Sequence, residues 1–246
     1  MRTVGKGNLY CFSPPVMLAT IIIEVLLLAY TLWRYKLDRV TRLVAAMLGL
    51  LAIFQLAEYM VCGGLGVTGD MWARLGYGAI TLLPPVGIHL SYTLAGRSNW
   101  PVIGASYALA AGFAGYFLFA TNVFAGSQCT GNYVVFQLGA FSSELYTLYY
   151  YGLLLLGVGL SLRFAHTVAS QKVKRTLMTF TLGYVLFMLP TTIMNTIDSA
   201  TIAGIPSIMC GFAVMLALVV VFWVLPQAAA VRGAVPSGRR RQLRRR

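Results

Sequence analysis

The sequence predicts an all-α, polytopic membrane protein, a bundle of seven transmembrane helices. Hydrophobic residues make up 59% of the 246 residues, only 10% are charged, and the mean hydropathy is +0.76. Such a chain has too little polar surface to cover a soluble globule. A helix needs about 20 apolar residues to cross a bilayer. We therefore assign seven spans, at approximately 13–34, 42–64, 72–95, 101–124, 144–165, 174–197 and 204–226.

These spans divide the chain into two parts. Residues 1–226 form the transmembrane domain, and residues 227–246 form a basic cytoplasmic tail that we expect to be disordered. Little of the chain lies outside the spans, so we expect no soluble catalytic or kinase domain. The first apolar run contains Glu24 and ends in Trp33-Arg34-Tyr35-Lys36, with no small-residue cleavage site. It is therefore assigned as a retained helix rather than a signal peptide.

The basic residues predict the orientation. In this topology only Arg2, Lys6 and Arg74 lie on one side of the membrane, which leaves sixteen of the 19 on the other. Cytoplasmic loops carry an excess of Lys and Arg. We therefore expect the amino terminus outside and the carboxyl terminus in the cytoplasm, in a bacterial cytoplasmic (inner) membrane. The arginines of the tail should bind anionic lipid headgroups, at about 1 kcal/mol each, rather than nucleic acid.

Two acidic residues inside spans predict a polar interior. Gln55 and Glu58 share a face of the second span, and Glu24 lies in the first. The connection between these spans is short, so they should be antiparallel neighbours that place Glu24 and Gln55 at similar depth. A charged side chain at mid-membrane costs about 2.5 to 3.5 kcal/mol even on insertion scales, so these residues should face the bundle interior.

Further polar residues extend this candidate site. Asn195 and Asp198 share a face of the sixth span, at or slightly outside the depth of Glu58. With the three residues above they could line an outward-opening pocket for a ligand or a proton relay. His89 in the third span is a weaker candidate, because a lone histidine is more often a hydrogen-bonded core residue. His166, the only other histidine, is predicted at the cytoplasmic surface. We therefore expect no metal site, no cofactor and no catalytic residue.

Pro84 and Pro85 predict a kink in the third span. Proline cannot donate a backbone hydrogen bond, and its ring displaces a carbonyl group of the preceding turn. In lipid the freed acceptors need a partner or a cavity. A neighbouring Ser or Thr is the favoured partner, and a ligand site is the alternative.

The outer side carries three cysteines and the longest connection. A disulfide from Cys129 to Cys62 or to Cys11 is as well supported as buried free thiols. Within the connection 125–143, the segment 133–137 (YVVFQ) could form a short hairpin or a lid.

Four tyrosines open the fifth span. Tyr146, Tyr149 and Tyr150 recur at helical spacing, with Tyr151 beside them. An outer-leaflet aromatic belt is favoured over a ligand cage.

From Trp72 through the sixth span the chain resembles a known membrane module. The likeness rests on WARLGYGAITLLPPVGIHLSYTLAG, on LFATN, and on the pairing of LYTLYYYGLLLLGVGLSLRF with QKVKRTLMTFTLGYVLFMLP. These segments resemble the seven-helix sensor module at the amino terminus of some bacterial histidine kinases and diguanylate cyclases. The resemblance implies a sensory domain. Because no output domain follows, a stand-alone version would signal through a partner protein.

Four classes of function follow from these observations. The favoured one is a receptor-like sensor that binds a small ligand or ion from outside and relays to a partner, with a homo-oligomer left open. A proton-coupled carrier or channel using Glu24 and Glu58 and an accessory assembly protein are the alternatives. An enzyme is least favoured, because no nucleophile with an adjacent base is visible. The seventh span has no lysine, which excludes a retinal Schiff base of the microbial rhodopsin kind.

Overall fold

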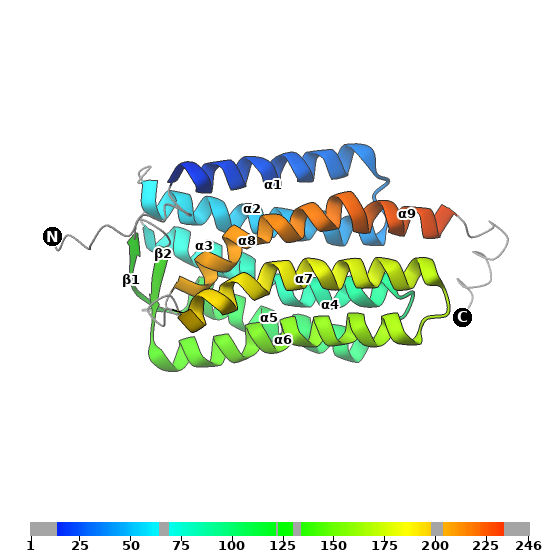
Figure 1. Cartoon of the computed structure of the whole chain (residues 1–246). Coiled ribbons are helices and arrows are strands. Elements are labelled where there is room, and N and C mark those ends of the chain that lie inside the picture. Colours follow the sequence, from blue (N-terminus) through cyan, green and yellow to red (C-terminus); the bar gives the residue numbers. More distant parts are fainter. Residues whose placement is uncertain (1–13, 64–68, 122, 130–133, 198–203, 234–246) are drawn as a thin grey trace.

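The computed structural model describes residues 14–63, 69–121, 123–129, 134–197 and 204–233. Long helices run side by side, and a two-stranded hairpin lies at one end of the bundle (Figure 1). Cys11, Asp198 and residues 234–246 of the predicted tail lie outside the described residues. Residues 227–233, part of the tail predicted to be disordered, instead continue the last helix. Within the described chain, six helical stretches are long and apolar enough to cross a membrane: Pro15–Arg34, Arg39–Cys62, Trp100–Phe119, Ser142–Thr167, Gln171–Ile197 and Ile205–Val231.

The first two helices form an antiparallel pair. Helix α1 covers Pro14–Arg34 and α2 covers Arg39–Gly63. A carboxylate oxygen of Asp38 accepts a hydrogen bond from the Thr41 amide at 2.9 Å, which caps the start of α2. The short connection makes the two helices neighbours along their length, as the sequence predicts.

The third predicted span is divided into two helices. Helix α3 covers Gly69–Thr81 and α4 covers Leu83–Leu94, at 13 and 12 residues. Neither is long enough to cross a bilayer alone. The break falls at Leu82, two residues before Pro84, and Pro84 and Pro85 remove two successive amide donors.

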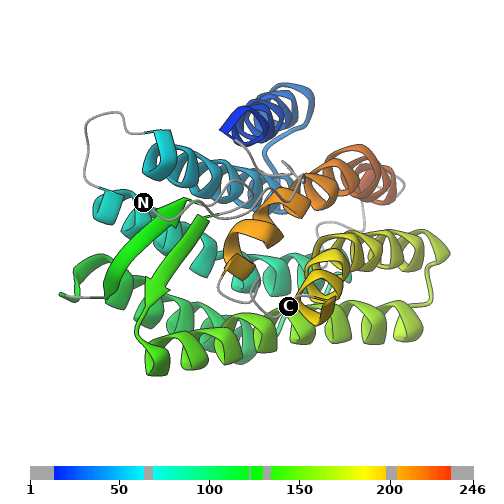
Figure 2. The ribbon, with the colours of Figure 1, turned by 60° about the vertical axis from the view of Figure 1, so that its left-hand side comes forward.

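The hairpin follows the next helix. Helix α5 covers Trp100–Phe119, and strands β1 (Phe124–Cys129) and β2 (Val134–Leu138) pair antiparallel with an irregularity between Phe124 and Gly126. Figure 2 shows the strands lying over the ends of the helices. The segment predicted as a hairpin or lid therefore contributes β2.

The remaining helices complete the bundle. Helix α6 covers Ala140–Thr167 and α7 covers Gln171–Ile197. Helix α8 (Ile205–Val219) continues through a π-helical segment, η2 (Val220–Val224), into α9 (Leu225–Gly233). A π-helical segment is a local irregularity within an otherwise α-helical span.

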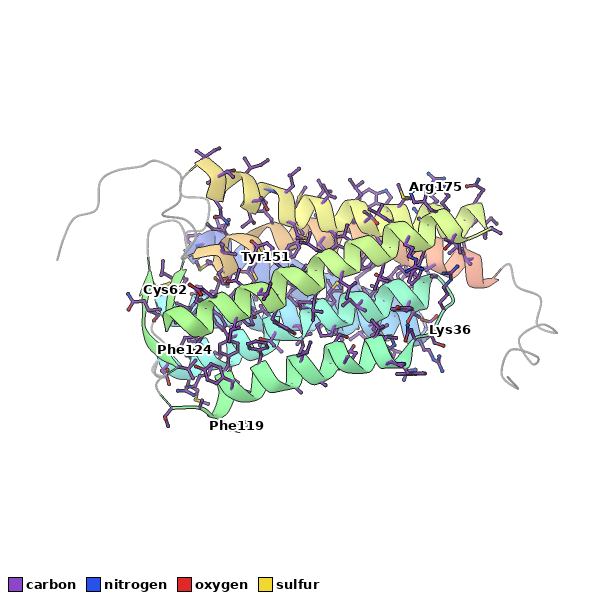
Figure 3. The ribbon with its side chains drawn as sticks, turned by 90° about the horizontal axis from the view of Figure 1, so that it is seen from below. Lys36, Cys62, Phe119, Phe124, Tyr151 and Arg175 are labelled. Atoms are coloured by element: carbon purple, nitrogen blue, oxygen red, sulfur yellow. A yellow bond between two sulfur atoms is a disulfide. The ribbon has the colours of Figure 1, made fainter. Side chains whose placement is uncertain are left out.

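The two ends of the bundle differ in charge. Figure 3 places Lys36 and Arg175 at the end opposite Cys62 and Phe124. At the hairpin end, Arg74 of α3 forms a 2.7 Å ion pair with Asp70 and also donates to the carbonyl oxygens of Phe117 and Ala120. This arginine is therefore held against the end of α5.

Tyr184 of α7 packs between α4 and α6, where two glycines make room for it. A Cβ atom at Gly87 would overlap the Tyr184 hydroxyl oxygen, and one at Gly157 would lie 3.2 Å from it. Tyr184 is fully buried. The middle of the bundle is therefore closely packed, and the space for a site lies elsewhere.

Candidate functional site

Two buried carboxyl groups lie within electrostatic reach of each other on α1 and α2. Glu24 of α1 is 0% exposed and Glu58 of α2 is 1% exposed, and the two interact electrostatically. Neither oxygen of Glu24 has a hydrogen-bond partner among the described residues, and the same holds for Oε1 of Glu58. The Glu58 carboxyl group does form a hydrogen bond with Ser207 of α8. An unpaired buried carboxyl group is costly, so this pair requires an explanation.

Gln55 joins the same interface between α1 and α2. Its Oε1 accepts a hydrogen bond from the Thr20 hydroxyl at 3.2 Å, and both side chains are buried. Thr20 and Glu24 are four residues apart on α1, and Gln55 and Glu58 are three apart on α2. The three candidates from the first two predicted spans are thus all buried on these two neighbouring helices, and the side chain that contacts Gln55 is Thr20.

The other predicted candidates have different surroundings or lie outside the described residues. Asn195 is half-buried near the end of α7 and does not line any cavity described below. Asp198 lies outside the described residues. His89 belongs to α4, where its Nδ1 lies 3.4 Å from the Tyr107 hydroxyl and its ring lies 6.1 Å from that of Trp100. Both of these aromatic neighbours belong to α5, so His89 faces α5.

The tyrosines of α6 point into the bundle. Tyr146, Tyr149 and Tyr150 are only 5%, 8% and 7% exposed. The prediction of an aromatic belt is therefore wrong for these three, because this face of α6 packs on neighbouring helices instead of meeting lipid headgroups. Tyr151 is half-buried.

Two of these tyrosines form hydrogen bonds with Thr81 at the break in the third predicted span. The Tyr149 hydroxyl donates to the Thr81 carbonyl oxygen at 2.6 Å. In an unbroken helix that carbonyl would accept from residue 85, which is a proline. The Thr81 hydroxyl in turn donates to the Tyr146 hydroxyl at 3.1 Å. For the Thr81 carbonyl the favoured Ser or Thr partner is therefore wrong, because a tyrosine from α6 takes that role.

A cavity of about 420 Å³ lies beside these tyrosines, under the hairpin. Its walls come from α3, α6 and α8, and its cover comes from β2. The residues that line it are Tyr77, Ile80, Val135, Phe136, Gln137, Leu138, Ser143, Tyr146, Thr147, Tyr150, Tyr151, Ile205, Pro206 and Met209.

The hairpin is fixed to the bundle at two points. A disulfide joins Cys129 of β1 to Cys62 at the end of α2. The Val134 amide of β2 donates to the Ser207 hydroxyl at 3.1 Å. Of the two disulfide pairings considered from the sequence, the structure has the one with Cys62. These links hold β2 in position over the cavity.

The start of α8 separates the cavity from the acidic pair. Met209 lines the cavity, whereas Ser207 is bonded to Glu58 and Cys210 interacts electrostatically with both glutamates. Tyr77, on the cavity wall, also interacts electrostatically with Glu58. Neither glutamate lines the cavity itself, but Glu58 lies near its wall at Tyr77, and both lie near Cys210 of α8.

Two other hollows are less suited to a specific ligand. An open groove of about 750 Å³ between α5 and α6 has an almost entirely apolar lining that includes Leu109 and Phe113. At the basic end, a shallow hollow of about 390 Å³ contains Arg97 and Arg163. The guanidinium of Arg97 already lies over the Phe164 ring and donates to the Thr167 hydroxyl.

Sequence reasoning missed several cavity residues. Gln137, Ser143 and Thr147 are ordinary polar residues in an outer loop and at a helix start, and no spacing marks them. The tyrosine repeat was the one usable signal. The cavity depends on where the hairpin lies, and the disulfide and the Val134–Ser207 bond determine that position.

The fold and the site define a helical membrane protein with a covered cavity at one end. The chain matches no protein-family model, and a comparison with curated proteins finds no match. Within the described residues, no group of three His, Cys, Asp or Glu side chains is placed to hold a metal ion.

Proposed function

We propose that this protein is a seven-span, receptor-like membrane protein that binds a small ligand from the outer side and relays binding to a protein partner. In this proposal α3 and α4 cross the membrane together as one broken span. Residues 69–94 as a helix would reach roughly 39 Å at 1.5 Å per residue, enough for a hydrocarbon core of about 30 Å. The hairpin end faces outward, and the basic end faces the cytoplasm of a bacterial cell.

The observation that carries the proposal is the covered cavity. Ligand sites are typically concave, largely apolar, and equipped with a few polar groups, at about 300 to 1,000 Å³. This cavity has about 420 Å³, an apolar and aromatic wall, and the side chains of Gln137, Ser143 and Thr147. A surface loop over a rigid scaffold is also a common place for binding.

The relay would run through the start of α8. A ligand that contacts Met209 presses on the turn whose Ser207 bonds Glu58 and the hairpin. Glu58 belongs to α2, so a small movement of α8 would change how α2 packs against it. The signal would leave through a partner protein, because the proposal assigns no output domain to this chain.

A thermal-stability assay tests this function. The purified protein is melted in detergent with a panel of ions, amino acids, sugars, amines and carboxylic acids. A ligand at one hundred times its Kd adds about 2.7 kcal/mol of stability. We expect at least one compound to raise the Tm of the wild type and of Leu148→Trp, but not of Thr147→Trp, whose indole would fill the cavity.

Thr147→Trp and Leu148→Trp change adjacent residues of α6, but only the first residue lines the cavity. Thr147 lines the cavity, whereas its neighbour Leu148 is 73% exposed and points away from it. A compound that stabilises all three proteins equally binds elsewhere. If no compound separates Thr147→Trp from Leu148→Trp, the cavity is not a binding site and the proposal fails.

A proton-coupled carrier is the second candidate, and one observation favours it. Glu24 lies buried at the α1–α2 interface without a hydrogen-bond partner among the described residues. Intramembrane carboxyl groups of this kind serve proton pathways. In liposomes with a pH gradient, a carrier would give sustained proton flux that Glu24→Gln abolishes. Ligand binding without flux would support the receptor instead.

A further inference from the structure

We propose that the cavity selects organic cations, that is, amines and quaternary ammonium compounds. This inference rests on the proposed ligand-binding function and names the chemical class of the ligand. It is based on two independent features: the arrangement of the tyrosine rings and the absence of basic side chains from the described lining.

The rings of the lining tyrosines form a continuous aromatic wall. The ring centroids of Tyr77 and Tyr146 are 5.6 Å apart, and those of Tyr146 and Tyr150 are 5.7 Å apart. Tyr151 continues the row at 6.5 Å from Tyr150, and Phe136 of the hairpin lies 5.3 Å from Tyr77. A cation within about 6 Å of an aromatic face is attracted by the ring quadrupole, and clusters of such rings bind quaternary ammonium groups.

The described lining offers no positive charge that would repel a cation. None of the described lining residues is Lys, Arg or His. Glu58 lies near the wall, close enough to interact with Tyr77, and Glu24 interacts with Glu58. Arg74 is the nearest basic residue along α3, but it is paired with Asp70 and bonded to two carbonyl groups of α5. A carboxylate ligand would therefore find no positively charged partner on this wall.

The size and the remaining polar groups fit a compact amine. About 420 Å³ holds roughly fourteen waters at about 30 Å³ each, which is ample for a trimethylammonium group with a short polar arm. Gln137 of the hairpin and Ser143 and Thr147 of α6 lie on the same cavity and provide hydrogen-bonding groups for that arm. The cationic group would face the rings.

A matched pair of probes tests the inference. Choline and 3,3-dimethyl-1-butanol have nearly the same shape, but only choline carries a charge. We expect calorimetric titration of the purified protein in detergent to give a choline affinity at least tenfold higher than that of the alcohol. Benzyltrimethylammonium and tetramethylammonium extend the test to larger and smaller cations.

Variants of the aromatic wall distinguish cation binding from binding that depends only on filling the cavity. Tyr150→Phe keeps an aromatic face and should bind choline within about threefold of the wild type, whereas Tyr150→Leu should bind it roughly tenfold more weakly. Tyr107→Leu, which alters a tyrosine on α5 outside the cavity, is the control and should bind choline normally.

The outcomes distinguish this inference from the function on which it rests. If the alcohol and choline bind equally and Thr147→Trp blocks both, the cavity is a ligand site without preference for cations, and only this inference is overturned. If a compound from the stability panel binds in the cavity and none of the cations does, the inference is also wrong and the proposed function stands. If no compound of either set is sensitive to Thr147→Trp, both are wrong.

Discussion

The hydroxyl group of Tyr149 on α6 donates a 2.6 Å hydrogen bond to the carbonyl oxygen of Thr81 on α3. Thr81 is the residue whose helical partner would be Pro85, so the bond replaces one that proline cannot make. A side chain from a neighbouring helix thereby makes the break in the third predicted span tolerable in an apolar environment. It also fixes α6, and hence the tyrosine wall, against α3.

Removing this hydroxyl should destabilise the protein. Tyr149→Phe leaves the Thr81 carbonyl without its donor, and an unsatisfied buried acceptor costs about 1 to 3 kcal/mol. We expect a lower Tm in detergent. Tyr151→Phe is the control, since Tyr151 is half-buried on the cavity, and it should melt close to the wild type. Equal melting of the two variants would mean that the Tyr149 bond contributes nothing.

The contact between Gly87 and Tyr184 gives a second prediction. Gly87→Ala places a methyl group on the Tyr184 hydroxyl oxygen, so the helices must move apart at a cost of about 1 to 3 kcal/mol. Tyr184→Phe removes the overlapping atom and leaves the nearest ring carbon 3.0 Å away. The double variant should therefore regain part of the lost stability in a double-mutant cycle of Tm values. Additive losses would contradict the contact.

The buried carboxyl group of Glu24 should reduce stability. Glu24→Met replaces an unpaired polar group by an apolar one of similar size, and we expect a gain of about 1 to 3 kcal/mol. The solvent-exposed Glu144 at the start of α6 supplies the control Glu144→Met, for which we expect no gain. A lower Tm for Glu24→Met than for the wild type would show that the carboxyl group has a stabilising partner. Chemical denaturation in detergent provides an independent measurement of the same difference.

The disulfide that anchors the hairpin should also stabilise the fold. Cross-links that close a loop of this size typically contribute about 2 to 4 kcal/mol. The double variant Cys62→Ser/Cys129→Ser should melt lower than the wild type. A reducing agent should lower the Tm of the wild type to that of the double variant and leave the double variant unchanged. If the reducing agent also lowers the Tm of the double variant, its effect does not come from the Cys62–Cys129 disulfide.

The elements predictable from sequence are those that depend on local composition. Long apolar runs located six of the helices, and the short connection after residue 34 correctly made α1 and α2 neighbours. Pro84 and Pro85 correctly marked a distortion, although the outcome is a break at Leu82. The polar residues of α1 and α2 could be recognised because a polar side chain within an apolar run must be buried among other helices, where it needs a polar partner.

The cavity could not be predicted, for a physical reason. Tyrosines at helical spacing fit a membrane belt and a buried wall equally well, since both lie on one face of a helix. Which face of α6 turns inward is decided by tertiary contacts such as that of Tyr149 with Thr81. The position of the hairpin likewise depends on pairings between residues far apart in the sequence, Cys62 with Cys129 and Val134 with Ser207.

Labelling of one engineered cysteine tests most directly whether the cavity opens to the outside. Ser143→Cys, in a Cys11→Ser background, places a thiol on the cavity wall. We predict that a membrane-impermeant maleimide labels it on intact cells, that Thr147→Trp slows this labelling, and that Lys174→Cys at the opposite end reacts only after permeabilisation. Labelling of Lys174→Cys on intact cells, with Ser143→Cys protected, would contradict both the orientation and the outward-facing site.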